Sequence, residues 1–169
     1  LPVRTHMLKI KGWKKILSAN GNHKKAGTAI LTSDKIDFKT KTIKRDQKSH
    51  YVMIKGSRGY NNCKYTCTQC WSTQIIKQLE LRRKRNSDTI IAGDFNTPLS
   101  ALGRSSRQKI NKETSDLICT IDQMDLIDIY RIFHPTAAKY TFFSLTHGSF
   151  SRIDHMLGHK TSFKNFKQN

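Results

Sequence analysis

The chain has 169 residues, the length of one ordinary domain or of part of a larger one. Its 31 Lys and Arg residues against 12 Asp and Glu residues give a net charge of +19, which favours a polyanionic partner, nucleic acid first and an acidic membrane surface second. No apolar run approaches the roughly 20 residues of a membrane-spanning helix, and residues 1–20 lack the apolar segment of a signal peptide, so we expect a soluble intracellular protein.

Short strands are predicted in the first third of the chain. The apolar runs at 26–31 and 50–55 lie between polar turns and are typical of buried strands. Residues 57–72 show no period of 2 or 3.6, and we assign no element there. The apolar spacing over 73–85 favours a helix, and the β-branched run at 89–92 predicts another buried strand.

The second half of the chain alternates helices and strands. A basic polar loop over 100–111 precedes an amphipathic helix that runs from about Leu117 to Met124, and a short apolar element covers 126–133. Two strands, at 140–143 and 151–157, are predicted around a turn at Gly148. Because the strands outnumber the helices and are interleaved with them, the pattern predicts α+β or α/β layers.

The sharpest local feature is Gly93-Asp94-Phe95-Asn96, directly after the strand predicted at 89–92. An acid and an amide two residues apart at a strand end emerge together at the rim of a sheet. There a carboxylate can hold or deprotonate a water, and an amide can bond a phosphate oxygen. The alternative is a turn in which these side chains bond their own backbone. The local pattern leaves both interpretations open.

A second acid lies in Ile153-Asp154-His155, again between apolar neighbours. An Asp in this place could orient an imidazole, since a carboxylate fixes the tautomer and stabilises the charged ring. The alternative is an edge-strand acid followed by a surface histidine with satisfied hydrogen bonds. Neither of the two motifs decides the function alone.

Together, the motifs resemble a known family. The matching segments are Lys9 to Trp13, Lys24 to Gly27, Gly93 to Ser100, Asp125 to Arg131, Tyr140 to Ser144 and Ser151 to His155. They resemble the N-terminal endonuclease domain of the second-frame protein of LINE-type non-LTR retrotransposons, a member of the endonuclease/exonuclease/phosphatase superfamily. The resemblance implies a partial domain over 5–168 with an α/β fold, an incomplete four-layered α/β sandwich of the DNase I-like type, in which 57–74 is a divergent loop.

The resemblance also implies an activity and the residues that carry it. In this family the domain nicks DNA with a divalent metal, normally Mg²⁺, to prime reverse transcription. By position, Asp94 would place or activate the attacking water, Asn96 would help to fix it and hold the phosphate, and Asp154 would orient a catalytic His. The residues implied for the DNA groove are Arg104, Thr141, Ser151 and Ile153. No residue is assigned as a metal ligand.

Partners and location follow from the same resemblance. DNA is the expected partner, RNA is a second nucleic acid to consider, and a reverse transcriptase domain would belong to the parent polyprotein. No membrane partner is expected, and the family implies the nucleus and the cytoplasm. The basic segment from Arg104 to Lys112 would track phosphates, its alternative being a solvated charged loop.

Several catalytic elements of the family have no counterpart in these 169 residues, so we expect impaired cleavage. They are an Asn and a Glu metal ligand on two early strands, and the His of a Ser-Asp-His segment near the end of the domain. Where the family has a catalytic Tyr, residues 64–74 look like the product of a local frameshift, so Tyr65 is not that Tyr. A zinc site at Cys63, Cys67 and Cys70 would need a fourth ligand and a different spacing. Gly103 stands where the family usually has Asp.

A function of another class also stays open. The charge of +19 suits a non-catalytic basic nucleic-acid binder, whose affinity would fall steeply with salt and show no sequence preference. A third interpretation is an unfolded product of a decayed element, which cooperative melting would exclude.

Overall fold

A computed structural model gives the fold and describes residues 11–19, 28–45, 51–58, 61–68, 89–105 and 110–164. The chain forms two compact units, Leu1–Cys67 and Thr68–Asn169. The helix predicted at 73–85 lies outside the described residues.

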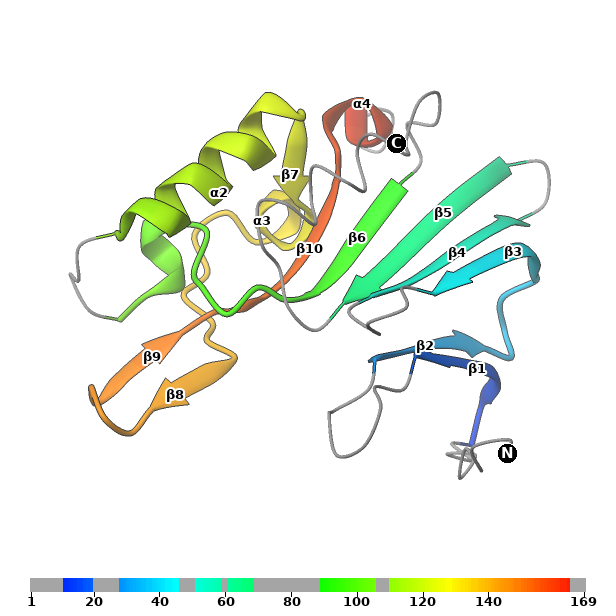
Figure 1. Cartoon of the computed structure of the whole chain (residues 1–169), viewed down its shortest axis with the longest axis horizontal. Helices are drawn as coiled ribbons and strands as arrows, with labels where there is room; N and C mark the ends of the chain where they lie inside the picture. Colours follow the sequence, from blue (N-terminus) through cyan, green and yellow to red (C-terminus); the bar gives the residue numbers. More distant parts are fainter. Residues whose placement is uncertain are drawn as a thin grey trace. The chain divides into compact units, whose positions relative to one another are not determined.

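The described part of the first unit is made of strands (Figure 1). β1 (Trp13–Ala19) and β2 (Thr28–Ser33) form an antiparallel pair. β3 (Phe38–Arg45), β4 (Tyr51–Arg58) and β5 (Asn61–Thr68) are neighbours in that order in another sheet. β2 and β4 confirm the strands predicted for the two early apolar runs.

Four successive residues of β4, 51–54, are buried, so both faces of this strand are covered. Val52 and Ile54 form a core with three partly buried side chains of the neighbouring strands: Ile30, Phe38 and Ile43. Each aliphatic side chain buried in this way stabilises the fold by about 1.5–3 kcal/mol. Burial on both faces explains the unbroken apolar run in the sequence.

The segment predicted as a divergent loop, 57–74, is a strand in much of its described part. β5 lies beside β4 and covers residues 61–68, so the loop prediction is wrong there. A neighbouring strand offers backbone donors and acceptors whatever the side-chain period is, and Tyr and Thr favour strands. Residues 69–74 lie outside the described residues.

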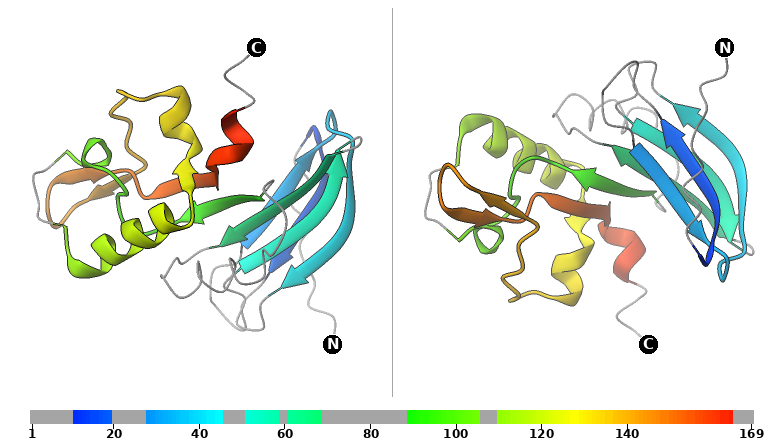
Figure 2. Two further views of the ribbon diagram at one scale, coloured as in Figure 1. Left: turned by 90° about the horizontal axis from the view of Figure 1, so that it is seen from above. Right: turned by 90° about the horizontal axis from the view of Figure 1, so that it is seen from below.

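In the second unit, β10 (Asp154–His159) lies between β6 (Thr89–Asp94) and β7 (Leu126–Asp128) and is antiparallel to both (Figures 1 and 2). Helix α2 (Lys112–Gln123) packs against β7, and the short α3 (Ile129–Phe133) packs against β7 and β10. The described residues also form the 3₁₀ turn η1 (Ala101–Gly103) and α4 (Lys160–Lys164). The strand predicted at 89–92 and the amphipathic helix are therefore confirmed.

The sequence explains where α2 begins and which of its faces is buried. The Asn111 side chain accepts a hydrogen bond from the Thr114 N–H at 2.8 Å, which caps the first turn. Leu117 and Ile121, four residues apart, are both buried, as an apolar stripe of helical period requires.

The last predicted strand, 151–157, is two strands in the structure. β8 (Phe142–Ser144) and β9 (Ser149–Ser151) form a hairpin around Gly148, whose φ is 56°, and β10 is separate from them. The break falls at residues 152 and 153. The Arg152 N–H donates to the Gly103 carbonyl at 2.8 Å, and the Ile153 N–H donates to the Thr141 hydroxyl at 3.1 Å. These bonds turn the chain out of one ladder and into the next.

Candidate active site

Asp94 and Asp154 meet at the ends of two neighbouring strands. Asp94 is the last residue of β6, Asp154 is the first residue of β10, and the antiparallel register makes them direct partners. Direct partners project from the same face of a sheet, with Cβ atoms about 4.5–5.5 Å apart. Asp154 is exposed and Asp94 is partly buried. β10 lies between β6 and β7 and is therefore not an edge strand, but at Asp154 it pairs with β6 alone, because its pairing with β7 begins at Leu157.

Asn96 lies on a turn that Asp94 closes. The Asn96 N–H donates to Oδ1 of Asp94 at 2.7 Å, and the φ of Asn96 is 52°. Asn is one of the few residues that tolerate this left-handed conformation. The turn interpretation is therefore confirmed, and it does not exclude a chemical role. The second carboxylate oxygen of Asp94 and the exposed side chain of Asn96 accept or donate no hydrogen bond within the described part of the chain.

Phe95 anchors this turn to the protein interior. Its side chain is 2% exposed, and its N–H donates to the Ile153 carbonyl at 2.8 Å. That bond continues the pairing of β6 with β10 one residue beyond the two aspartates. A buried ring between Asp94 and Asn96 therefore holds both polar residues at the sheet rim.

His155 is buried and pairs with Asp128, not with Asp154. Its Nδ1 is 2.8 Å from Oδ2 of Asp128, and its Nε2 is 3.2 Å from the Thr97 carbonyl oxygen. Both partners are acceptors, so both contacts are hydrogen bonds only when both ring nitrogens carry hydrogen. The interpretation of His155 as a surface residue is wrong, because alternation along β10 sends it to the face opposite Asp154.

Asp128 also begins α3, and its role was not predicted from the sequence. Its Oδ1 accepts the Tyr130 N–H at 3.0 Å, in the manner of a helix N-cap. The Phe95 ring meets the His155 ring edge to face, with centroids 5.3 Å apart. An Asp directly before a helical segment is the one sequence signal that could have pointed to the N-cap role of Asp128.

The four residues implied for the DNA groove lie together. Arg104 forms an isolated bridge with Ser151, the Thr141 N–H donates to the Ser151 carbonyl at 3.0 Å, and the Thr141 hydroxyl accepts the Ile153 N–H. Thr141 is exposed, Arg104 and Ser151 are partly exposed, and Ile153 is 9% exposed. Their contact with DNA stays a prediction.

The β8–β9 hairpin beside these residues presents aromatic rings to solvent. Phe142, Phe143 and Phe150 are each between 43% and 48% exposed. The Phe150 centroid lies 4.6 Å from that of Phe143 and 5.8 Å from that of Tyr140. Figure 1 shows the hairpin projecting from the end of the sheet at which β10 begins.

The paired carboxylates are oxygen donors of the kind that Mg²⁺ binds. Mg²⁺ binds oxygen ligands, and in proteins it commonly uses one or two carboxylates together with substrate phosphates and waters. Asp94 and Asp154 supply two carboxylates on one face. Over the described residues no third His, Cys, Asp or Glu joins a pair to complete an all-protein site. The side chains of Cys63, Cys67 and Cys70, at which the sequence argues against a zinc site, are not among those that the structure describes.

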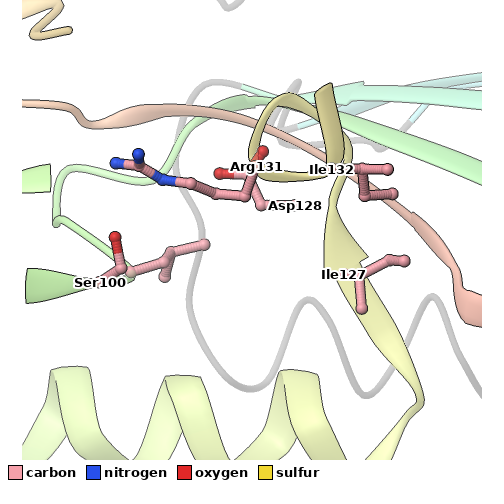
Figure 3. A pocket seen from close by; sticks show the side chains of 6 residues that line it. Ser100, Ile127, Asp128, Arg131 and Ile132 are labelled. Carbon is pink, nitrogen blue, oxygen red and sulfur yellow. The ribbon is translucent and has the colours of Figure 1, made fainter. Parts of the chain in front are cut away.

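A pocket of about 320 Å³ has Asp128 in its lining (Figure 3). The side chains that line it are Leu99, Ser100, Ile127, Asp128, Arg131 and Ile132. Both carboxylate oxygens of Asp128 are engaged, by Tyr130 and His155, and Arg131 donates to the Ala137 carbonyl at 2.6 Å. We assign no chemistry to this pocket.

Comparisons with known proteins bear on the family and the fold. Residues 4–167 match the model of the endonuclease/exonuclease/phosphatase family. Wherever the structure describes a helix, it is too short or too polar to cross a membrane.

Three solved structures illustrate the likeness in fold. The endonuclease domain of TRAS1, a telomere-specific non-LTR retrotransposon, has a TM-score of 0.65 at 11% identity, over 92% of this chain and 70% of that chain. The 3′ phosphatase NExo from Neisseria, bound to a product DNA hairpin, has a TM-score of 0.69 at 15% identity, over 89% and 68%. The catalytic domain of Xenopus laevis APE2 has a TM-score of 0.64 at 15% identity, over 90% and 68%. The predicted α/β fold of the DNase I-like type is confirmed.

Proposed function

Because the chain belongs to the endonuclease/exonuclease/phosphatase family, we propose that it carries the DNA-nicking site of a LINE-type non-LTR retrotransposon endonuclease. The reaction is hydrolysis of a DNA phosphodiester bond with a divalent metal, Mg²⁺. The observation that carries the proposal is the direct pairing of Asp94 with Asp154. Asn96 lies on the turn that Asp94 closes, so these three polar residues share one rim.

Each of the three residues has a role that suits its contacts. Asp94 keeps one carboxylate oxygen for a water that it places or activates, while the other oxygen holds the turn. Asn96 offers an amide N–H to a phosphate oxygen and helps to fix the water. Asp154, which is exposed, has the position of the acid that orients the family's catalytic imidazole, a His that these 169 residues do not match. Mg²⁺, when bound, polarises the phosphate and offsets the charge of the two carboxylates.

DNA is the substrate class that the charge and the relatives support. The net charge of +19 favours a polyanion. Two of the similar solved structures hold DNA products: NExo from Neisseria with a hairpin, and D. rerio TDP2 with a single strand. The further partners that we propose, RNA and the reverse transcriptase domain of a parent polyprotein, rest on the sequence resemblance, as does the location in nucleus and cytoplasm.

For the 169-residue chain alone, we propose cleavage near background. Of the catalytic set that the resemblance implies, Asp94, Asn96 and Asp154 are matched, and the Glu ligand, the Tyr and the His are not. The rate at which the chain nicks a supercoiled plasmid in Mg²⁺ tests this expectation. Rapid turnover that Asp94→Ala abolishes would contradict the expected background rate while supporting the site.

DNA binding tests the site without depending on turnover. In EDTA, two carboxylates near a phosphate repel it, so Asp94→Asn or Asp154→Asn should raise the affinity for a DNA duplex several-fold, on the order of 1 kcal/mol for one close charge pair in water. In Mg²⁺ the same variants should lose the tightening that the unchanged chain shows. Asp116→Asn, an exposed change on α2, is the matched control. If neither variant differs from this control in either buffer, the proposed site is wrong.

A non-catalytic basic binder is the second candidate, favoured by the surface of the first unit. Lys39 and Lys44 on β3 and Lys55 on β4 are all exposed. This candidate predicts the same steep salt dependence. It predicts that Mg²⁺ weakens DNA binding, as any competing cation does, and that Asp94→Asn behaves like the Asp116→Asn control in both buffers, so the binding experiment separates the two candidates.

A further inference from the structure

Thr141 joins the β8–β9 hairpin to the chain that leads into β10. Its N–H donates to the Ser151 carbonyl at 3.0 Å. Its hydroxyl oxygen accepts two successive backbone N–H groups, that of Ile153 at 3.1 Å and that of Asp154 at 3.2 Å. One side-chain oxygen therefore holds the point at which the chain leaves β9 and enters β10.

These two bonds use the whole acceptor capacity of the hydroxyl. A threonine hydroxyl has two acceptor lone pairs and one O–H donor, so only the O–H of Thr141 remains for another partner. The resemblance implies Thr141 as a DNA contact, but its oxygen is already engaged within the free chain. A second role for this residue follows from what the oxygen holds.

Ile153, the residue before Asp154, is held on both of its backbone polar groups. Its N–H donates to Thr141, and its carbonyl accepts the N–H of Phe95 at 2.8 Å. Phe95 belongs to the turn that carries Asp94 and Asn96. Thr141 and Phe95 therefore fix, from two different segments, the backbone that places Asp154 opposite Asp94.

The rest of the hairpin gives Thr141 a defined position. Tyr140, its neighbour in sequence, stacks on Phe150 of β9 with an interplanar angle of 26°. The Phe150 N–H donates to the Ser105 hydroxyl at 2.7 Å. The strand opposite Thr141 is thus held by contacts that do not involve the Thr141 side chain.

We propose that Thr141 is a positioning residue for Asp154: its hydroxyl fixes the entry of β10 and keeps the two aspartates paired. This role rests on the proposed function, because it explains how that site keeps its shape. It differs from a DNA contact, which would matter only when DNA is bound. The free chain therefore decides between the two roles.

Amide hydrogen exchange of the full 169-residue chain, without DNA, is the test. Thr141→Val replaces the hydroxyl by a methyl group, and the exchange of the Ile153 and Asp154 amides should accelerate about tenfold, as expected for the loss of one hydrogen bond. Thr141→Ser restores the hydroxyl and should return both rates to within about threefold of the original. Thr146→Val, an exposed change in the turn of the same hairpin, should leave both amides unchanged.

The readout for the carboxylates uses Mn²⁺ alone as the probe. Paramagnetic broadening at Asp94 and Asp154 should need several-fold more Mn²⁺ in Thr141→Val than in Thr141→Ser. The amide of Leu157, in the middle of β10, reports that each variant is folded. If Thr141→Val does not fold, Thr141→Ala takes its place in the comparison with Thr141→Ser. Thr141→Ala should then lose amide protection and Mn²⁺ broadening, and Thr141→Ser should keep both.

Two results would overturn the proposal: unchanged protection of both amides without the hydroxyl, or no recovery with serine. Failure of the proposed function looks different, because it would show as absent DNA binding and absent Mn²⁺ broadening in the unchanged chain. The amide pattern would stay as predicted in that case.

Discussion

Asp94 and Asp154 are direct cross-strand partners in β6 and β10. Two like charges that face each other in this way destabilise a sheet. The pair at this solvent-facing rim therefore lowers the stability of the fold, as residues of functional sites commonly do. The pair is therefore open to a stability test as well as to a binding test.

Asp154→Asn should stabilise the chain. Removal of one of two facing charges should raise the free energy of unfolding by about 0.2–1 kcal/mol at low salt, and the gain should shrink as salt screens the pair. Urea unfolding at two salt concentrations measures both effects, with Asp116→Asn as the control for loss of an exposed carboxylate. A lower stability of Asp154→Asn would mean that the carboxylate is part of the structural framework and not a cost to it.

Asn96 offers a way to separate backbone conformation from side-chain chemistry. Its φ of 52° costs a residue with a Cβ about 1–2 kcal/mol, and glycine avoids that cost. Asn96→Ala should thus lower the free energy of unfolding by about 1 kcal/mol relative to Asn96→Gly. Both variants should weaken DNA binding in Mg²⁺ to a similar extent, because both lack the amide. Equal stability of the two variants would contradict the left-handed turn, and unchanged DNA affinity in both would contradict the role of the amide.

The turn that carries Asp94 and Asn96 was predictable from the sequence, because it is a short local motif directly after an apolar strand. The pairing of Asp94 with Asp154 was not predictable from spacing, since the register of antiparallel strands depends on contacts between distant segments. The resemblance to a known family supplied that link. For the same reason β5 was missed: its strand is defined by the neighbouring β4 and not by its own side-chain period. His155 was misjudged because its partner, Asp128, comes from another element.

The contributions of His155 and Asp128 to the free energy of unfolding should be strongly coupled. The two side chains are 3% and 10% exposed, so His155→Phe leaves a carboxylate oxygen in a largely buried place without its donor. We expect a loss of about 2–4 kcal/mol in the free energy of unfolding. The double variant His155→Phe with Asp128→Asn should recover part of this loss, with an interaction energy of about 0.5–3 kcal/mol. Urea unfolding of the four chains of this cycle measures it.

An exposed histidine provides the control for this cycle. His147→Phe changes an exposed residue of the β8–β9 turn and should shift stability by less than about 0.5 kcal/mol. Strict additivity of the His155 and Asp128 variants would show that the 2.8 Å contact contributes nothing to stability, and would remove the link between α3 and the turn that carries Asp94.

Salt dependence of DNA binding should reveal where the phosphates lie. Each phosphate contact contributes about 0.9 to the slope of log affinity against log salt for duplex DNA. Arg104 bridges Ser151 in the predicted DNA groove, so Arg104→Gln should lower the slope by about that amount. Lys55→Gln, on the first unit, should leave it unchanged if binding is confined to the groove. Equal losses in both variants would mean that DNA contacts the lysines of β3 and β4 as well, which is the behaviour of a non-catalytic basic binder. A loss confined to Arg104 places the phosphates beside the hairpin whose Thr141 holds Asp154 in position.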